Sequence, residues 1–178
     1  MTARIWSETA GQGGDLALIH GWGMNASVWS ALLPELRQDY RVTVLDLPGH
    51  GNSADASFSD LPSLSSQILD VLPEKTVLLG WSLGGLVALW LASLEPERFG
   101  RALLVSSSPC FVQRPGWPAA LEHGVFDAFS SGLEQDYMAT LKRFLALQLK
   151  GAEDARNLAR SLGAGLTARP PQKQALVQ

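Results

Sequence analysis

The segment Gly80-Trp81-Ser82-Leu83-Gly84-Gly85 constrains the fold more than any other part of this sequence. The apolar run Thr76–Leu79 precedes it, and an apolar stretch of helical length, Leu83–Leu94, follows it. Its glycines carry no side chain, so the backbones before and after Ser82 can approach closely. The pattern predicts a strand, a sharp turn that lifts the serine above the strand end, and then a helix.

Strand-like and helical patterns alternate on both sides of this turn, which predicts an α/β fold with a doubly wound, mostly parallel sheet. Asn25 or Ser27 is expected to cap the helix that contains Val28 and Leu36, and Asp60 the helix that follows it. The expected strands cover residues 5–8, 16–19, 40–45, 76–79 and 102–105, and the expected later helices cover 61–72 and 83–94.

The pattern changes after Ser106, where several prolines interrupt the chain. Three helical patterns follow, near residues 119–129, 133–149 and 152–162. A helical segment placed after a strand of such a sheet is expected to cover the strand ends as a lid. We therefore expect a core over 1–108, a lid over 109–165, and a tail over 166–178, without clear periodicity, that leads to core strands and a helix which the sequence lacks.

Length and composition favour a single domain, because the chain has 178 residues and 46% of them are hydrophobic. The net charge is −3 at pH 7, but it divides into −6 for residues 1–132 and +3 for residues 133–178. The acidic body argues against nucleic acid as a partner. The basic end suits either an acidic partner or an ordinary solvated helix surface.

Two further features bear on the cellular setting. Cys110 is the single cysteine, which rules out an internal disulfide and fits a reducing compartment. We find no secretion signal and no apolar stretch that is long enough to span a bilayer. The expectation is a soluble cytoplasmic protein without a membrane partner.

The Gly-x-Ser-x-Gly pattern in its strand–turn–helix setting is typical of a nucleophile elbow, so Ser82 is the candidate nucleophile. An acyl-transfer serine needs donors for the oxyanion. One candidate is the backbone N–H of Leu83, at a helix N-terminus, and the other is the backbone N–H of Trp22 in His20-Gly21-Trp22-Gly23. The indole of Trp22 would also form a wall of the acyl pocket. The alternatives are an incidental Gly/Ser turn and a core tryptophan.

Together with Asp46-Leu47-Pro48-Gly49-His50-Gly51-Asn52-Ser53 and Pro96-Glu97-Arg98, these motifs resemble the α/β-hydrolase superfamily. Ser107-Ser108-Pro109-Cys110-Phe111 and Arg143-Phe144-Leu145-Ala146-Leu147-Gln148 are more specific. They resemble the biotin-synthesis carboxylesterases that act on the methyl ester of pimeloyl-[acyl-carrier protein]. The resemblance implies an α/β-hydrolase fold with a helical lid and no metal or cofactor. It also implies a substrate site formed by Trp22, Trp81, Ser82, Leu83, Phe144, Leu145, Ala146, Leu147 and Gln148.

The resemblance also gives the basic C-terminal segment a role. Arg143, Lys150, Arg156 and Arg160 would contact an acidic acyl carrier protein, which brings a phosphate on its arm. The alternative is that these are solvated surface side chains. For the stretch from Phe144 to Gln148 the alternative is ordinary packing of an amphipathic lid helix.

A base for Ser82 is not evident. The superfamily orders its triad as serine, acid, histidine, and the sequence ends before the strands that would bring the last two. His20 is expected to order the oxyanion loop. His123 with Asp127 could form a base and its orienter, but a surface His and Asp is the favoured interpretation; Asp46 and Asp55 have no reason to be the triad acid. A truncated product is therefore expected. The edge of strand 102–105 would be open or covered by the lid, and an open edge would allow self-association.

Several functions remain open. The first is a serine carboxylesterase for the methyl ester of pimeloyl-[acyl-carrier protein], inactive or incomplete as it stands. A general short-chain carboxylesterase or a carbon–carbon bond hydrolase would use the same serine. A non-catalytic module that binds an acyl group or carrier protein is a hypothesis of a different class, and one half of a split enzyme is the last.

Overall fold

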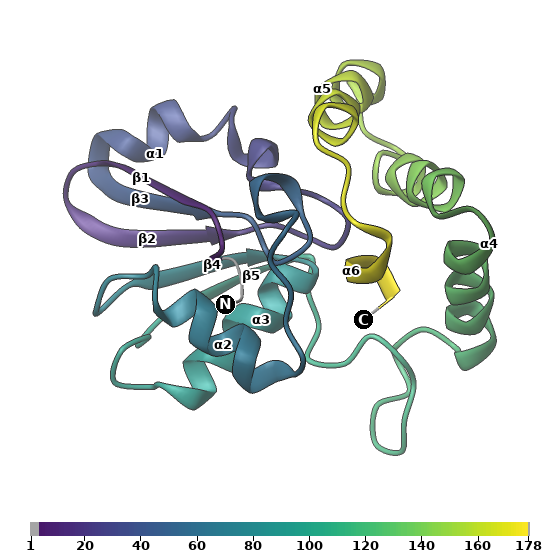
Figure 1. The fold of residues 1–178 in the computed structure, drawn as a ribbon, viewed down its shortest axis with the longest axis horizontal. Helices are drawn as coiled ribbons and strands as arrows, with labels where there is room; N and C mark the ends of the chain where they lie inside the picture. The colour runs from purple at the N-terminus through teal and green to yellow at the C-terminus, as the bar shows by residue number, and fades with distance from the viewer. Residues whose placement is uncertain (1–3, 178) are drawn as a thin grey trace.

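The computed structural model describes residues 4–177, and they form an α/β fold built on a five-stranded sheet (Figure 1). The strand order is β1-β3-β2-β4-β5. Only β1 runs antiparallel to its neighbour, so the expected doubly wound, mostly parallel sheet is confirmed. The strands are β1 (Ser7–Gly11), β2 (Gly14–Ile19), β3 (Tyr40–Leu45), β4 (Val77–Trp81) and β5 (Ala102–Val105).

The core lies on both faces of the central strand, β2. Along β2, Ala17 and Ile19 pack on the side of the helices α2 (Leu61–Leu69) and α3 (Leu83–Leu94). Leu16 and Leu18 point the other way, toward Trp29. Alternate residues of a strand face opposite sides, so a continuous apolar run is what a strand buried on both faces requires.

The segment after β2 differs from the single helix that the sequence predicts. It forms the short 3-10 helix η1 (Ala26–Trp29) and then the separate helix α1 (Leu33–Asp39), which starts afresh with Pro34 in its first turn. Asn25, one of the two expected caps, accepts the N–H of Ser27 at 3.0 Å. A second 3-10 helix, η2 (Gly51–Ser53), lies in the expected loop after β3.

Asp60 caps α2 as expected, in a capping box with Ser63. The helix ends at Leu69, three residues earlier than predicted.

The lid consists of α4 (His123–Gln148), α5 (Ala155–Ala168) and α6 (Lys173–Val177). The break expected near residue 130 lies instead at Asp136, which has non-helical backbone angles. The Asp136 carboxylate accepts the N–H of Ala139 at 3.0 Å, so it caps the second half of α4 from within. Residues 112–121 form a bridged loop, so no helix begins at 119.

The last residues are more ordered than the sequence predicts. Helix α5 continues to Ala168, beyond the expected lid boundary at 165, and α6 lies against α4 and the core (Figure 1). The N–H of Gln172 donates to the carbonyl of Gly49 at 2.7 Å, and Lys173 Nζ donates to the carbonyl of Glu134 at 2.8 Å. These contacts are between residues far apart in the chain, which periodicity cannot reveal.

Strand β5 is one of the two edge strands of the sheet in the described part of the chain, and all four of its residues are exposed. Leu103, Leu104 and Val105 are 42–48% exposed. Within residues 4–177, no helix is both long enough and apolar enough to cross a membrane.

Candidate active site

Ser82 lies at the junction of β4 and α3 with a left-handed backbone, φ 55° and ψ −116°. A non-glycine residue adopts such angles only where its surroundings impose them. Here the N–H of Ser82 donates to the carbonyl of Val105 at 2.8 Å, and the helix begins at the next residue. This is the backbone geometry that the sequence pattern predicts for a nucleophile elbow.

The glycines of the elbow are required by close backbone approach. A Cβ on Gly80 would lie 2.1 Å from the carbonyl oxygen of Gly84, and a Cβ on Gly84 would lie 2.2 Å from the carbonyl oxygen of Ile19. Because both obstacles are backbone atoms, no side-chain movement could relieve the clash. The elbow therefore depends on these glycines for space.

The loop His20-Gly21-Trp22-Gly23 packs directly against the elbow. A Cβ on Gly21 would lie 3.4 Å from Ser82 Cβ and 3.3 Å from the carbonyl oxygen of Trp81. Among residues 4–177, the backbone N–H groups of Trp22 and Leu83 donate to no backbone or side-chain acceptor. Leu83 is also the first residue of α3, where the helix dipole favours negative charge.

His20 is fully buried and holds this loop in place. Its Nε2 accepts the N–H of Leu47 at 2.9 Å, so Nδ1 carries the proton and donates to the carbonyl of Gly21 at 2.8 Å. Burial, with a smaller contribution from the His50 ring, lowers the pKa of His20 from 6.5 to about 3. With both nitrogens engaged, His20 orders the loop, as expected, and has no free lone pair for Ser82.

The other two histidines are also not bonded to Ser82. His50 is buried, donates from Nδ1 to the carbonyl of Pro48 at 2.9 Å, and its pKa is lowered by burial. His123 and Asp127 are exposed on the first turns of α4 and make no hydrogen bond to each other. Within residues 4–177, no side chain is hydrogen-bonded to the Ser82 hydroxyl.

Asp46, which the sequence gives no reason to treat as a triad acid, has a structural role. It is fully buried, and its carboxylate accepts the N–H groups of Ala26 at 2.6 Å and Asn52 at 2.7 Å.

An aromatic cluster connects the loop to the lid. The ring of Trp22 contacts Phe129 and Phe144 edge-on, with centroids 5.0 and 5.1 Å apart. Trp81 packs against the neighbouring apolar cluster that contains Leu141 and Leu145. Of these, Phe129 and Leu141 were missed by sequence reasoning, because nothing in a helical pattern shows which apolar positions meet a loop more than 100 residues away.

The stretch from Phe144 to Gln148 divides between two faces of α4. Phe144 is half-buried against Trp22, and Leu145 is buried. Ala146, Leu147 and Gln148 are exposed, Leu147 by 67%. Five consecutive residues of a helix cannot share one face at 3.6 residues per turn.

The predicted carrier-protein residues Arg143, Lys150, Arg156 and Arg160 are all exposed. They belong to α4, the turn after it, and α5. None of the four forms an ion pair within the part of the chain that the structure describes.

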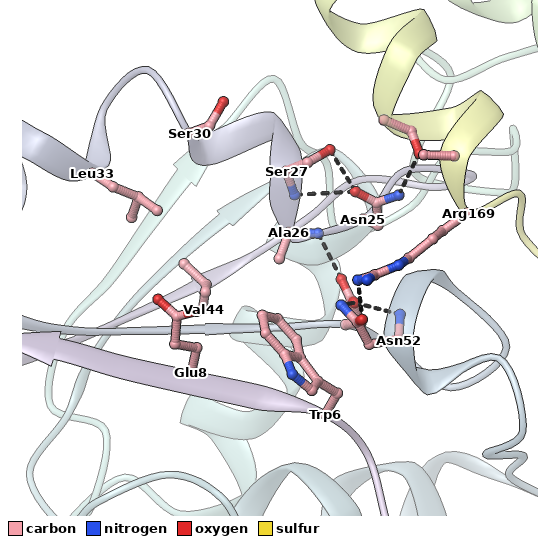
Figure 2. A pocket seen from close by; sticks show the side chains of 13 residues that line it. Trp6, Glu8, Asn25, Ala26, Ser27, Ser30, Leu33, Val44, Asn52 and Arg169 are labelled. Carbon is pink, nitrogen blue, oxygen red and sulfur yellow. Dashed lines mark hydrogen bonds between the residues drawn. The ribbon is translucent and has the colours of Figure 1, made fainter.

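A cavity of about 420 Å³ lies elsewhere, between η1, the start of β1 and the end of α5 (Figure 2). It contains none of the predicted site residues. Asn25 in its wall donates to the carbonyl of Gly165, and Arg169 donates to the side chain of Asn52. These bonds join the lid to the core. Residues 4–177 contain no cluster of His, Cys, Asp and Glu that could hold a metal ion.

The match to known proteins decides the family. The model of the alpha/beta hydrolase family matches residues 16–176. The chain belongs to this family. It is 49% identical over 172 residues to a pimeloyl-[acyl-carrier protein] methyl ester esterase from Aeromonas salmonicida, covering 95% of this chain and 67% of the relative. The protein with the same name from Nitrosomonas europaea is 44% identical over 170 residues, covering 95% and 68%. The chain thus spans about two thirds of the length of these relatives.

Solved structures of other alpha/beta hydrolases agree with the fold. An esterase from Exiguobacterium antarcticum superposes with a TM-score of 0.85 at 25% identity, over 98% of this chain and 67% of the other. A bromoperoxidase from Bacillus anthracis gives a TM-score of 0.77 at 21% identity, over 97% and 67%, and this likeness concerns the fold alone. The resemblance expected from the motifs is therefore confirmed.

Proposed function

We propose that this alpha/beta hydrolase chain is a serine carboxylesterase that hydrolyses the methyl ester of pimeloyl-[acyl-carrier protein], with Ser82 as the nucleophile. The left-handed backbone of Ser82 at the strand–helix junction carries the proposal. The relatives with this activity in their names, 40–49% identical to the chain, support the substrate.

In the proposed reaction, Ser82 Oγ attacks the ester carbonyl and passes its proton to a general base. No side chain of residues 4–177 is hydrogen-bonded to Ser82 in this role, so the base is itself part of the proposal. The negative charge on the carbonyl oxygen is stabilised by the N–H groups of Trp22 and Leu83. Methanol then leaves with a proton, and water releases the free acid from Ser82. No metal or organic cofactor takes part in these steps.

The acyl chain is proposed to lie along the apolar wall that Trp22, Phe129, Phe144 and Leu145 form at the lid. Trp81 is proposed to continue this apolar wall beside the elbow. The exposed Ala146, Leu147 and Gln148 would reach an acyl chain only if α4 turned about its axis.

The exposed cations Arg143, Lys150, Arg156 and Arg160 are proposed to receive the acidic carrier protein. Such side chains mainly accelerate encounter, because exposed charges act over about 10 Å at moderate salt. The Arg156→Glu/Arg160→Glu variant should weaken carrier binding on the order of tenfold, and added salt should weaken binding to the parent chain. Arg101→Glu/Arg114→Glu, which reverses the same number of exposed arginines outside this basic segment, is the matched control.

The test of the reaction is methanol release from methyl-pimeloyl carrier protein, compared with a free short-chain ester. We expect hydrolysis that prefers the carried ester and is lost in Ser82→Ala. Its rate should be far below that of a complete triad, because no side chain of residues 4–177 is bonded to the Ser82 hydroxyl. An equal rate on the free ester would favour a general short-chain carboxylesterase. Hydrolysis that persists in Ser82→Ala would exclude Ser82 as the nucleophile.

A second candidate is a non-catalytic module that binds the acylated carrier protein. The absence of a side chain bonded to the Ser82 hydroxyl, within the described residues, favours it. Binding of the carried ester without methanol release, unchanged in Ser82→Ala, would support this candidate. If the chain neither bound nor hydrolysed the carried ester, both candidates would be contradicted.

We also propose that the exposed edge of β5 allows self-association. Sedimentation velocity should show concentration-dependent dimers that Leu104→Lys removes.

Because Cys110 is the single cysteine, we propose that the protein is located in the cytoplasm.

A further inference from the structure

The carbonyl of Ser82 is held by a side chain that the reaction does not otherwise use. Ser107 Oγ donates to this carbonyl at 2.7 Å. The N–H groups of Gly85 and Leu86, in the first turn of α3, donate to the same oxygen at 3.0 and 3.3 Å. The carbonyl of Ser82 and the N–H of Leu83 belong to one peptide group.

The other proposed oxyanion donor is arranged in the same way. The N–H of Trp22 shares its peptide group with the carbonyl of Gly21. That carbonyl accepts His20 Nδ1–H at 2.8 Å and the N–H of Met24 at 3.1 Å. In each of the two peptide groups that carry a proposed oxyanion N–H, one side chain therefore donates a hydrogen bond to the carbonyl oxygen.

The backbone around Ser107 is shaped for this contact. Ser106 follows β5 with φ 46°, a left-handed turn that is uncommon for serine. Val105, just before it, accepts the N–H of Ser82. Val105 and Ser107, at and just after the end of β5, therefore bind the N–H and the carbonyl of the nucleophile. A Cβ on Gly85 would lie 2.5 Å from Ser107 Cβ, so a side chain at position 85 would displace Ser107. This explains why a second glycine follows Gly84.

We propose that Ser107 is a positioning residue for the Leu83 oxyanion donor and that it forms a pair with His20, which does the same for Trp22. A trans peptide is planar, with its C=O and N–H pointing in opposite directions. Fixing the carbonyl therefore fixes the direction of the N–H. A carbonyl that accepts a hydrogen bond also makes the N–H of the same peptide a stronger donor. This inference rests on the proposed function.

Infrared spectroscopy of a bound ester tests the pair without turnover. The Ser82→Ala chain is mixed with methyl-pimeloyl carrier protein labelled with ¹³C at the ester carbonyl. Oxyanion donors lower the stretching frequency of that carbonyl. We expect Ser107→Ala and His20→Phe, each in the Ser82→Ala background, to lose about half of the shift, because each residue positions one of the two donors. Ser107→Cys, nearly the same size but a weak donor, should lose part of it.

Two matched controls separate positioning from general loosening. Ser108→Ala removes the neighbouring hydroxyl, which bonds to the carbonyl of Cys110 at 2.8 Å. His50→Phe removes the other buried imidazole, whose ring centre is 5.2 Å from that of His20. Both should keep the shift.

An unchanged shift in Ser107→Ala, Ser107→Cys and His20→Phe would overturn the inference while leaving the proposed function in place. A loss of the shift in the controls as well would also overturn it. If the Ser82→Ala chain itself showed no shift, the proposed oxyanion site would be wrong, and the inference would fail with it.

Discussion

Strands β2 and β5 have the same kind of sequence and opposite surroundings. Leu16–Ile19 and Ala102–Val105 are both continuous apolar runs at the centre of a strand–helix pattern. The residues of the first are buried, whereas those of the second are all exposed. The difference comes from place in the sheet, because β2 lies between β3 and β4 while β5 has β4 on one side only. An apolar run thus indicates a strand, and its neighbours decide how much its side chains stabilise the fold.

The largest expected effect lies where the elbow meets the end of β2. Gly84→Ala places a Cβ 2.2 Å from the carbonyl oxygen of Ile19, so we expect a loss of more than about 4 kcal/mol in the free energy of unfolding. Gly163 lies in the lid helix α5 with no atom within 4 Å of an added Cβ. Gly163→Ala should therefore stabilise by about 0.5–1 kcal/mol. Urea denaturation measures both, and equal effects would show that the elbow is not tightly packed.

A paired truncation compares the two strands directly. Leu18 in β2 is fully buried and Leu104 in β5 is 42% exposed. Leu18→Ala should cost about 2–5 kcal/mol in the free energy of unfolding, and Leu104→Ala less than about 1 kcal/mol. If the second cost as much as the first at high protein concentration, β5 would be covered in solution, which would support the proposed self-association.

The buried imidazoles behind the elbow give a smaller, pH-dependent effect. The folded-state pKa of His20, about 3, lies below the ordinary 6.5, and that of His50 is also lowered. Below pH 6.5 the unfolded chain therefore binds protons that the folded chain does not, and stability falls as the pH falls. His20 alone should contribute a loss on the order of 1–2 kcal/mol between pH 6.5 and 5.

Equilibrium unfolding at a series of pH values measures this slope. In His20→Phe the slope should be shallower in the same window, since the phenyl ring has no nitrogen to protonate. An unchanged slope would show that His20 does not stay neutral in the fold.

The smallest expected effect is on the outer face of the lid. Leu147 is 67% exposed, so Leu147→Ala should change the free energy of unfolding by no more than about 0.5 kcal/mol. Leu145→Ala, on the buried face of the same helix, should cost about 2 kcal/mol or more. A loss of acyl-carrier binding in Leu147→Ala without a loss of stability would place this face in the substrate site after all.

The sequence was most informative where local chemistry acts alone. The helix Leu83–Leu94 and the strands Tyr40–Leu45 and Ala102–Val105 have the bounds that their patterns predict. Asp60 caps its helix because its carboxylate binds a free backbone N–H only three residues away, and such a contact can be predicted from local sequence. The break in α4 was misplaced because the cap at Asp136 is formed within a continuous helical pattern.

Local sequence was enough to predict the α/β class, the turn at Ser82 and the motif loops at residues 20–23 and 46–53, because spacing and glycine content act through the local backbone. Packing in three dimensions was needed to show that β5 is exposed, that Phe129 contacts Trp22, and that Ser107 bonds to the carbonyl of the nucleophile. Each of these depends on which elements become neighbours in space. Residues 25 or more positions apart carry no shared period that would reveal such a contact.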